Sequence, residues 1–182
     1  MAAAMDIFAA KGYHGAIVDD IVAASGTSKG AFYHYFPSKQ GIFLTLMDEL
    51  AAAIEGGVEA AIESESGALA KVQAALQVVL ETAAVRRDLV KILLVEAVGL
   101  GPTLEHKRLE IHGRFAGQIR RHLDRAVSDR TIPTQDTGLA AQAWIGALNE
   151  VITQWLMADG DDLMARLPGL QALLLRSIGA PR

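Results

Sequence analysis

Apolar residues recur at intervals of three and four along almost the whole chain, and this spacing constrains the fold more than any other feature. Such spacing is typical of amphipathic α-helices, whereas the alternation of apolar and polar residues that marks a strand never extends over a useful length. The chain is therefore predicted to be all-α. Nine helices are expected, over residues 1–10, 18–24, 28–35, 38–53 or beyond, 68–84, 86–98, 103–127, 136–157 and 163–178.

Local signals predict several of the helix boundaries. Gly12 follows a basic last turn and ends the first helix, and the turn around Gly26 separates the second helix from the third. Pro37 stops the third helix, and Ser38 is the expected N-cap of the fourth. The pair Pro168-Gly169 is expected to interrupt or kink the last helix.

Composition restricts the class of protein. Apolar residues make up 51% of the chain and the mean hydropathy is +0.25, so extra apolar surface is expected to be buried in a partner or around a ligand. The chain has no cysteine, which excludes disulfides, thiolate nucleophiles and Cys-ligated zinc. No secretion leader and no membrane-length apolar run is recognised. The protein is expected to be cytoplasmic and to have no membrane partner.

Residues 12–39 follow the order of a helix-turn-helix, in which the second helix enters the major groove of DNA. Thr27 and Ser28 offer hydroxyl groups to phosphate or base, and Lys29 adds a positive charge. Gly30 allows a close approach of the backbone, and Ala31 is small enough to meet a thymine methyl group. These residues are therefore predicted to read or approach DNA, with the Tyr33 hydroxyl on a phosphate and His34 exposed or near one.

The segment from Ser28 to Lys39 reads Ser-Lys-Gly-Ala-Phe-Tyr-His-Tyr-Phe-Pro-Ser-Lys, and it resembles the most specific local motif of the TetR family of one-component bacterial regulators. The resemblance implies a nine-helix TetR-like fold, with an N-terminal helix-turn-helix head on a helical-bundle body for ligand binding and dimerisation. It implies a DNA-binding domain over residues 1–50 and an effector-binding and dimerisation domain over residues 51–182. It also implies that the chain begins inside the first helix, and Ala16 replaces a threonine that family members usually carry.

Residue by residue, the resemblance assigns base contacts to Thr27, Lys29, Gly30 and Ala31, and phosphate contacts to Ser28, Tyr33, Tyr35 and Lys39. It implies an effector pocket among the fifth to eighth helices and a homodimer joined through the last two. The pocket is predicted to include Leu76, Leu94, His112, Phe115, Trp144 and Asn149. The dimer interface is predicted to include Ala143, Ala147, Val151, Trp155, Leu170 and Leu174.

The function that follows is a ligand-responsive regulator of transcription, a repressor that a small hydrophobic effector releases from a palindromic double-stranded DNA operator. No catalytic residue, metal site or cofactor is predicted, because His106 and His112 lack the spacing of a helical metal pair. The alternative is a helical adaptor or small-molecule-binding protein that no longer reads DNA. Residues 1–50 favour this alternative slightly, since three lysines face five carboxylates there and the net charge is −2.

Overall fold

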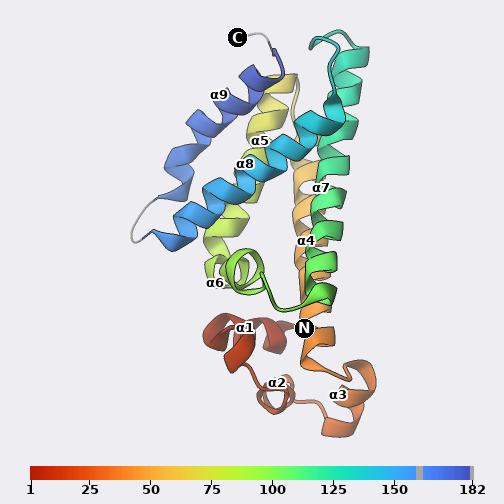
Figure 1. Cartoon of the computed structure of the whole chain (residues 1–182), viewed down its shortest axis with the longest axis vertical. Helices are drawn as coiled ribbons and strands as arrows, with labels where there is room; N and C mark the ends of the chain where they lie inside the picture. The colour runs from red at the N-terminus through yellow and green to blue at the C-terminus, as the bar shows by residue number, and fades with distance from the viewer. Residues whose placement is uncertain (159–161, 181–182) are drawn as a thin grey trace. The chain divides into compact units, whose positions relative to one another are not determined.

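The structure, a computed structural model, describes residues 1–158 and 162–180, with the side chains of all of these except residues 68 and 69. These residues form nine α-helices and two short helical segments, with no strand among them (Figure 1). The all-α prediction is therefore confirmed. The elements are α1 (Ala2–Gly15), α2 (Val18–Ser25), α3 (Lys29–Tyr35), α4 (Lys39–Ser64), α5 (Ala68–Val85), α6 (Arg87–Lys91), the π-helix η1 (Ile92–Glu96), α7 (Pro102–Ser128), α8 (Thr137–Met157), the 3-10 helix η2 (Leu163–Arg166) and α9 (Leu167–Ser177).

The chain packs as two compact units. The first contains residues 1–52 and 86–109, and the second contains residues 53–85 and 110–182, so α4 and α7 each contribute residues to both. Residues 86–109 belong to the first unit because α1 packs on α6 and η1. The functional division at residue 50 stays a prediction, and it groups residues 86–109 differently from the packing.

A glycine C-cap and two serine N-caps explain the boundaries near the predicted helix-turn-helix. Gly26 ends α2 with a positive φ of 67°, a conformation that glycine adopts without a steric penalty. The hydroxyl oxygen of Ser28 accepts a hydrogen bond from the amide of Ala31 at 3.3 Å and so caps α3. The predicted cap at Ser38 is confirmed, since its oxygen accepts a hydrogen bond from the amide of Gly41 at 3.0 Å.

Two boundaries differ from the sequence-based prediction. Helix α1 continues to Gly15, although Gly12 interrupts it with non-helical angles. The helix expected over residues 86–98 divides into α6 and η1, where the amide of Ala97 donates to the carbonyl oxygen of Ile92 in the i→i+5 pattern of a π-helix. The interruption expected near Pro168 is confirmed, since η2 ends at Arg166 and α9 begins at Leu167. Pro168 lies in the first turn of α9, where a proline loses no intrahelical hydrogen bond.

An aromatic cluster forms the core of the first unit. The ring centroid of Phe43 on α4 lies 5.2 Å from that of Phe8 and 4.9 Å from that of Tyr13, both on α1. Ile21 of α2 and Leu46 of α4 are fully buried beside it in the same unit. Aromatic pairs at such distances stabilise a core beyond their buried area, so this cluster ties α1 firmly to α4.

In the second unit, α5 packs against α9 and η2. The indole nitrogen of Trp144 on α8 donates a hydrogen bond of 3.1 Å to the hydroxyl oxygen of Ser177 at the end of α9. The buried apolar side chains here come mainly from α5, α8 and α9: Leu76, Leu80, Ala141, Trp144, Leu148, Ile152, Trp155, Leu156, Leu170 and Leu174.

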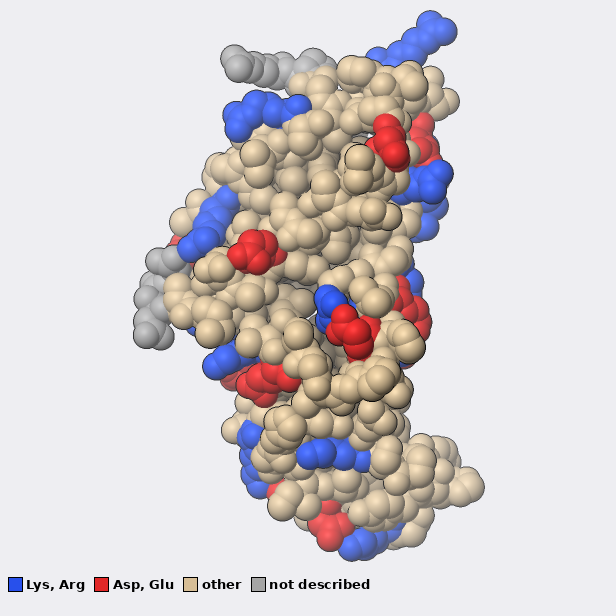
Figure 2. Space-filling view, viewed as in Figure 1, with Lys and Arg blue, Asp and Glu red and all other residues tan. Residues whose placement is uncertain are grey.

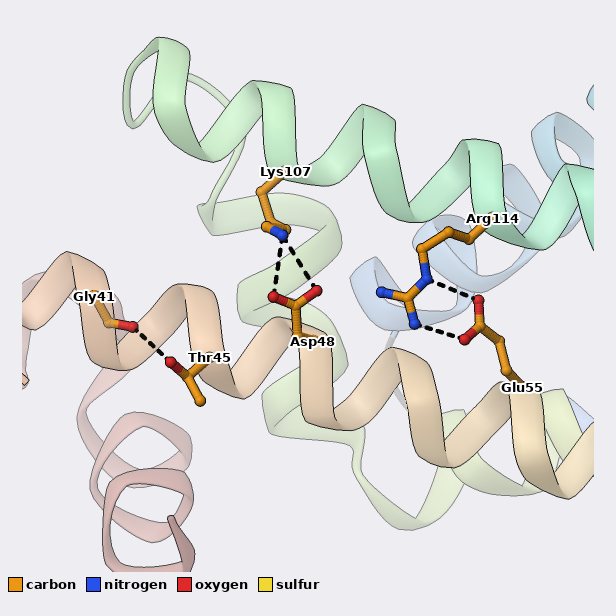
Figure 3. Close-up of polar contacts among 6 residues, drawn as sticks. All are labelled: Gly41, Thr45, Asp48, Glu55, Lys107 and Arg114. Atoms are coloured by element: carbon orange, nitrogen blue, oxygen red, sulfur yellow. Dashed lines mark hydrogen bonds and ion pairs between the residues drawn. The ribbon is translucent and has the colours of Figure 1, made fainter. Parts of the chain in front are cut away.

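Ion pairs join α4 to α7 within each unit (Figure 3). In the first unit, Lys107 Nζ lies 3.0 Å from Asp48 Oδ2. In the second, the guanidinium of Arg114 forms a bidentate pair with the carboxylate of Glu55, with bonds of 3.0 Å from Nε and 2.6 Å from Nη2. In the second unit, Gln118 also contacts Glu59, so that two pairs there share a separation of 59 residues and α4 and α7 run in the same direction within that unit.

Candidate functional site

The turn between α2 and α3 is held by short-range hydrogen bonds. The Ser25 hydroxyl donates to the carbonyl oxygen of Val22 at 2.8 Å, and the hydroxyl oxygens of Ser25 and Thr27 lie 2.8 Å apart. The amide of Thr27 also donates to the Ser25 oxygen, at 3.3 Å. The turn and the cap at Ser28 therefore fix the orientation of α3 relative to α2. A fixed orientation of the second helix is what a helix-turn-helix needs.

All but one of the predicted DNA-binding side chains are exposed. Residues 27–31 and 33–35 lie on the surface of the first unit, whereas Phe32 is buried between them and Phe36 is half-buried against it, with ring centroids 5.5 Å apart. Phe32 therefore packs α3 inward onto the first unit. The exposed residues lie on α3 and in the turn before it, and Lys39, which is half-buried, is the exception.

The ammonium group of Lys39 contacts the protein. It donates hydrogen bonds to the carbonyl oxygens of Tyr13 at 2.8 Å, Ala16 at 3.1 Å and His14 at 3.3 Å, and it lies 4.8 Å from the centroid of the Tyr13 ring. These carbonyls belong to the last turn of α1 and the loop after it, where a helix end carries partial negative charge. The structure therefore shows Lys39 in a positioning contact, and the phosphate contact that the resemblance implies stays a prediction.

Lys29 and Tyr33 share an acidic neighbour on α2. The Lys29 Nζ atom lies 2.9 Å from Oδ1 and 3.0 Å from Oδ2 of Asp19, and the Tyr33 hydroxyl donates to Oδ1 at 3.3 Å. The hydrogen bond from Lys29 lowers the pKa of Asp19, and the same contact raises the pKa of Lys29. The charges of α3 and α2 are thus already paired in the free protein.

Charge elsewhere on the surface is dispersed. On the face drawn in Figure 2, lysine and arginine side chains lie in separate patches among uncharged and acidic residues. On α7, Arg108 pairs with Glu105 at 2.5 Å and Arg120 lies 3.6 Å from Asp124. These two cations therefore have acidic partners on the same helix.

A polar cluster in the second unit was missed by the sequence analysis. The amide nitrogen of Gln118, which is buried, donates to the carbonyl oxygen of Glu55 at 3.2 Å and to Glu59 Oε2 at 2.9 Å. The Nε2 atom of His122 lies 3.4 Å from the same Glu59 oxygen. Gln118 follows buried Ile111 by seven residues, and this polar residue on an apolar helix face is the signal that could have revealed the cluster.

The hydrogen bond from Gln118 and the contact with His122 hold the pKa of Glu59 below its ordinary value of 4.5. The stabilisation that these contacts give is therefore fully present when the pH is above the ordinary pKa of Glu59. It is lost as the pH falls through the lower pKa of the folded state. Glu59→Gln is expected to be less stable than the wild type at neutral pH by under about 1 kcal/mol, because the side chain is 41% exposed. Urea unfolding should show this difference vanish in acid, and a difference that persisted at low pH would contradict the assignment.

The predicted effector-pocket residues are partly brought together. In the second unit, the amide nitrogen of Asn149 on α8 lies 3.1 Å from Nε2 of His112 on α7. Leu76 and Trp144 are buried in the same unit and Phe115 is half-buried. Leu94 belongs to η1 of the first unit. The structure thus brings His112 and Asn149 together, and the pocket itself stays a prediction.

The predicted dimer residues divide into two groups. Trp155, Leu170 and Leu174 are only 4%, 5% and 2% exposed within the single chain, because α8 and α9 pack them against their own unit. For these three, the structure corrects the expectation that they face a partner. Ala143 is exposed, and Ala147 and Val151 are half-buried. Other apolar side chains that the sequence analysis did not select are exposed on the same two helices: Leu139, Met157 and Leu173.

Two other kinds of site are absent from the part of the chain that the structure describes. No group of three histidine, cysteine or acidic side chains there has a geometry suited to a metal ion. Likewise, none of the helices in that part combines the length and apolarity needed to cross a lipid bilayer.

Comparison with known families identifies both parts of the chain. Residues 1–46 match the family model described as bacterial regulatory proteins of the tetR family, and residues 65–167 match the model of the tetracyclin repressor-like C-terminal domain. The second match covers more than half of the chain. The two models agree with the helix-turn-helix motif and with the helical second part that follows it.

Individual relatives are also regulators. The fatty acid metabolism regulator protein of Bacillus subtilis is 26% identical over 178 residues, which are 97% of this chain and 92% of that protein. The transcriptional regulator EthR of Mycolicibacterium smegmatis is 43% identical over 47 residues, which are 26% of this chain and only 22% of that protein. The crystal structure of the regulator FadR from Bacillus subtilis in complex with stearoyl-CoA matches with a TM-score of 0.87 and 26% identity, covering 97% of this chain and 96% of that one.

Proposed function

The chain belongs to the TetR family of bacterial transcriptional regulators, and from this premise we propose that it is a repressor that a long-chain fatty acyl-CoA releases from its operator. The observation that carries the DNA-binding half of the proposal is the exposure of residues 27–31 and 33–35. They lie on α3 and in the capped turn between α2 and α3. These side chains are the types that reach base edges and phosphates when such a helix lies in the major groove.

The effector half of the proposal rests on similarity and chemistry. FadR of Bacillus subtilis, which resembles this chain over nearly its full length, was crystallised with stearoyl-CoA. The second unit of this chain contains Leu76, Phe115 and Trp144, whose types suit an acyl chain, and the His112–Asn149 pair, whose types suit a polar group. Sites for such ligands are mostly apolar with a few polar groups that orient the ligand.

The proposal includes a homodimer joined by α8 and α9. In a single chain these helices expose Leu139, Ala143, Met157 and Leu173, and a two-fold partner would bury such an apolar edge. Two heads on one dimer read half-sites about 34–36 Å apart, so the operator is a palindrome. Light scattering at micromolar concentration tests the dimer, and a monomer would remove this part of the proposal.

The experiment that tests the function starts with selection of bound duplexes from a random pool. We expect a palindrome to be enriched and stearoyl-CoA to release it, whereas coenzyme A without an acyl chain should not. Differential affinity of about 1–3 kcal/mol between the two states suffices for a regulatory response. Failure of stearoyl-CoA to release the DNA would remove the effector assignment alone. If no sequence were enriched at low salt, the adaptor alternative would replace the DNA-binding proposal.

A further inference from the structure

The carboxylate of Asp19 on α2 forms an ion pair with Lys29, the lysine of α3. Lys29 is the only lysine or arginine in residues 29–35, and its Nζ atom lies 2.9 and 3.0 Å from the two Asp19 oxygens. The hydroxyl of Tyr33, one helical turn along α3, donates to Oδ1 of the same carboxylate at 3.3 Å. Two groups that the proposed function directs at DNA therefore meet on one anion supplied by α2.

This arrangement has the chemistry of a phosphate contact. An ammonium and a phenol hydroxyl that converge on two oxygens of one anion are the donors that bind the non-bridging oxygens of a DNA phosphate. Asp19 accepts from Lys29 through both of its oxygens and also takes the one hydroxyl proton of Tyr33, so a phosphate that binds through these same donors needs the carboxylate to leave. DNA must therefore displace Asp19 before Lys29 and Tyr33 can bind a phosphate.

Fold stability does not account for the pair. The side chains of Lys29 and Asp19 are 64% and 60% exposed, and exposed ion pairs contribute little to the stability of a fold. Asp19 also lies in the first turn of α2, where a carboxylate favours the helix, but Asp20 lies in the same turn and supplies the same effect. Asp20 pairs with Lys11 of α1 at 2.6 Å and makes no contact with α3 in this structure.

We infer that Asp19 is an intramolecular competitor of DNA phosphate for Lys29 and Tyr33, and that it weakens binding to every DNA sequence. The inference rests on the proposed DNA-binding function. A competitor of this kind lowers sequence-independent affinity, which is set largely by phosphate contacts, and leaves base contacts unchanged. With Asp19 present, base contacts would therefore supply a larger share of the binding free energy relative to phosphate contacts, which favours the operator over other sequences.

The test compares Asp19→Asn with Asp20→Asn in the full chain. Both variants remove one negative charge from the first turn of α2, and each releases one lysine, Lys29 of α3 or Lys11 of α1. The difference between them therefore compares the release of the lysine on α3 with the release of a lysine outside it. Binding to a random-sequence duplex is measured by fluorescence anisotropy over a series of salt concentrations. We expect Asp19→Asn to bind about two- to fivefold more tightly than Asp20→Asn, and its salt dependence to steepen by about one unit.

A second background makes the result specific. In Lys29→Met protein, Asp19→Asn should bind no more tightly than Asp20→Asn, because no ammonium is left to release. Equal affinities of the two single variants, or a loss of affinity in Asp19→Asn, would overturn the inference while the wild type still bound DNA. If neither the wild type nor any variant bound a duplex at low salt, the proposed function itself would fail.

Discussion

Lys39→Met is expected to lower the free energy of unfolding by about 1.5–3 kcal/mol, the usual value of hydrogen bonds that involve a charged group. The substitution keeps an apolar stem and removes the ammonium that donates to the carbonyl oxygens of Tyr13, His14 and Ala16. Those carbonyls lie where α1 ends and the loop to α2 begins. Their loss of a donor should loosen the attachment of this loop to the start of α4. Urea unfolding followed by circular dichroism measures the change.

DNA binding separates this positioning role from a phosphate contact. If Lys39 acts only through the loop, Lys39→Met should weaken DNA binding without changing the slope of log affinity against log salt. A direct phosphate contact would instead lower that slope by about one unit, with little effect on stability. Lys29→Met is the matched control, since the same change at an exposed lysine should leave stability unchanged and lower the slope. A stable Lys39→Met protein with the lower slope would restore the phosphate assignment.

Gly12→Ala is expected to destabilise the first unit by about 1–3 kcal/mol, the cost of holding a residue with a side chain in a region of backbone space that is almost confined to glycine. Gly12 has φ 67° and ψ 175° inside α1. A methyl group there would also lie 2.9 Å from Oε2 of Glu96 at the end of η1, so that this side chain must move. The same urea titration measures the loss, and heat denaturation should follow it.

Two further variants divide the effect of Gly12→Ala into its causes. Gly15→Ala is the control, because its methyl group would meet only Lys11 Cβ at an ordinary 3.5 Å and its φ is not positive. It should be neutral or slightly stabilising. Combining Gly12→Ala with Glu96→Ala removes the close contact and leaves the backbone strain, so only part of the loss should return. A Gly12→Ala protein as stable as the wild type would contradict the conformation described for this residue.

Much of the fold follows from signals only a few residues long. The spacing of apolar residues predicts helices throughout, and Gly26, Pro37 and Ser38 mark real boundaries because a cap or a break depends on atoms within one turn. The motif from Ser28 to Lys39 identifies the family for the same reason, since a short helix and its cap are encoded locally. Burial of Phe32 beside exposed neighbours also follows from helical spacing.

What the tertiary structure alone decided is the partner of each side chain. Lys39 and Tyr13 are 26 residues apart, and Arg114 and Glu55 are 59 apart, so no local pattern specifies that they meet. The wide apolar stripe of α8 shows that Trp155 should be buried, but only the packing of α8 and α9 decides that it is buried within its own chain. The width of a hydrophobic stripe indicates how much of its own surface a helix must bury. Which neighbouring helix covers that stripe depends on the placement of all the other helices.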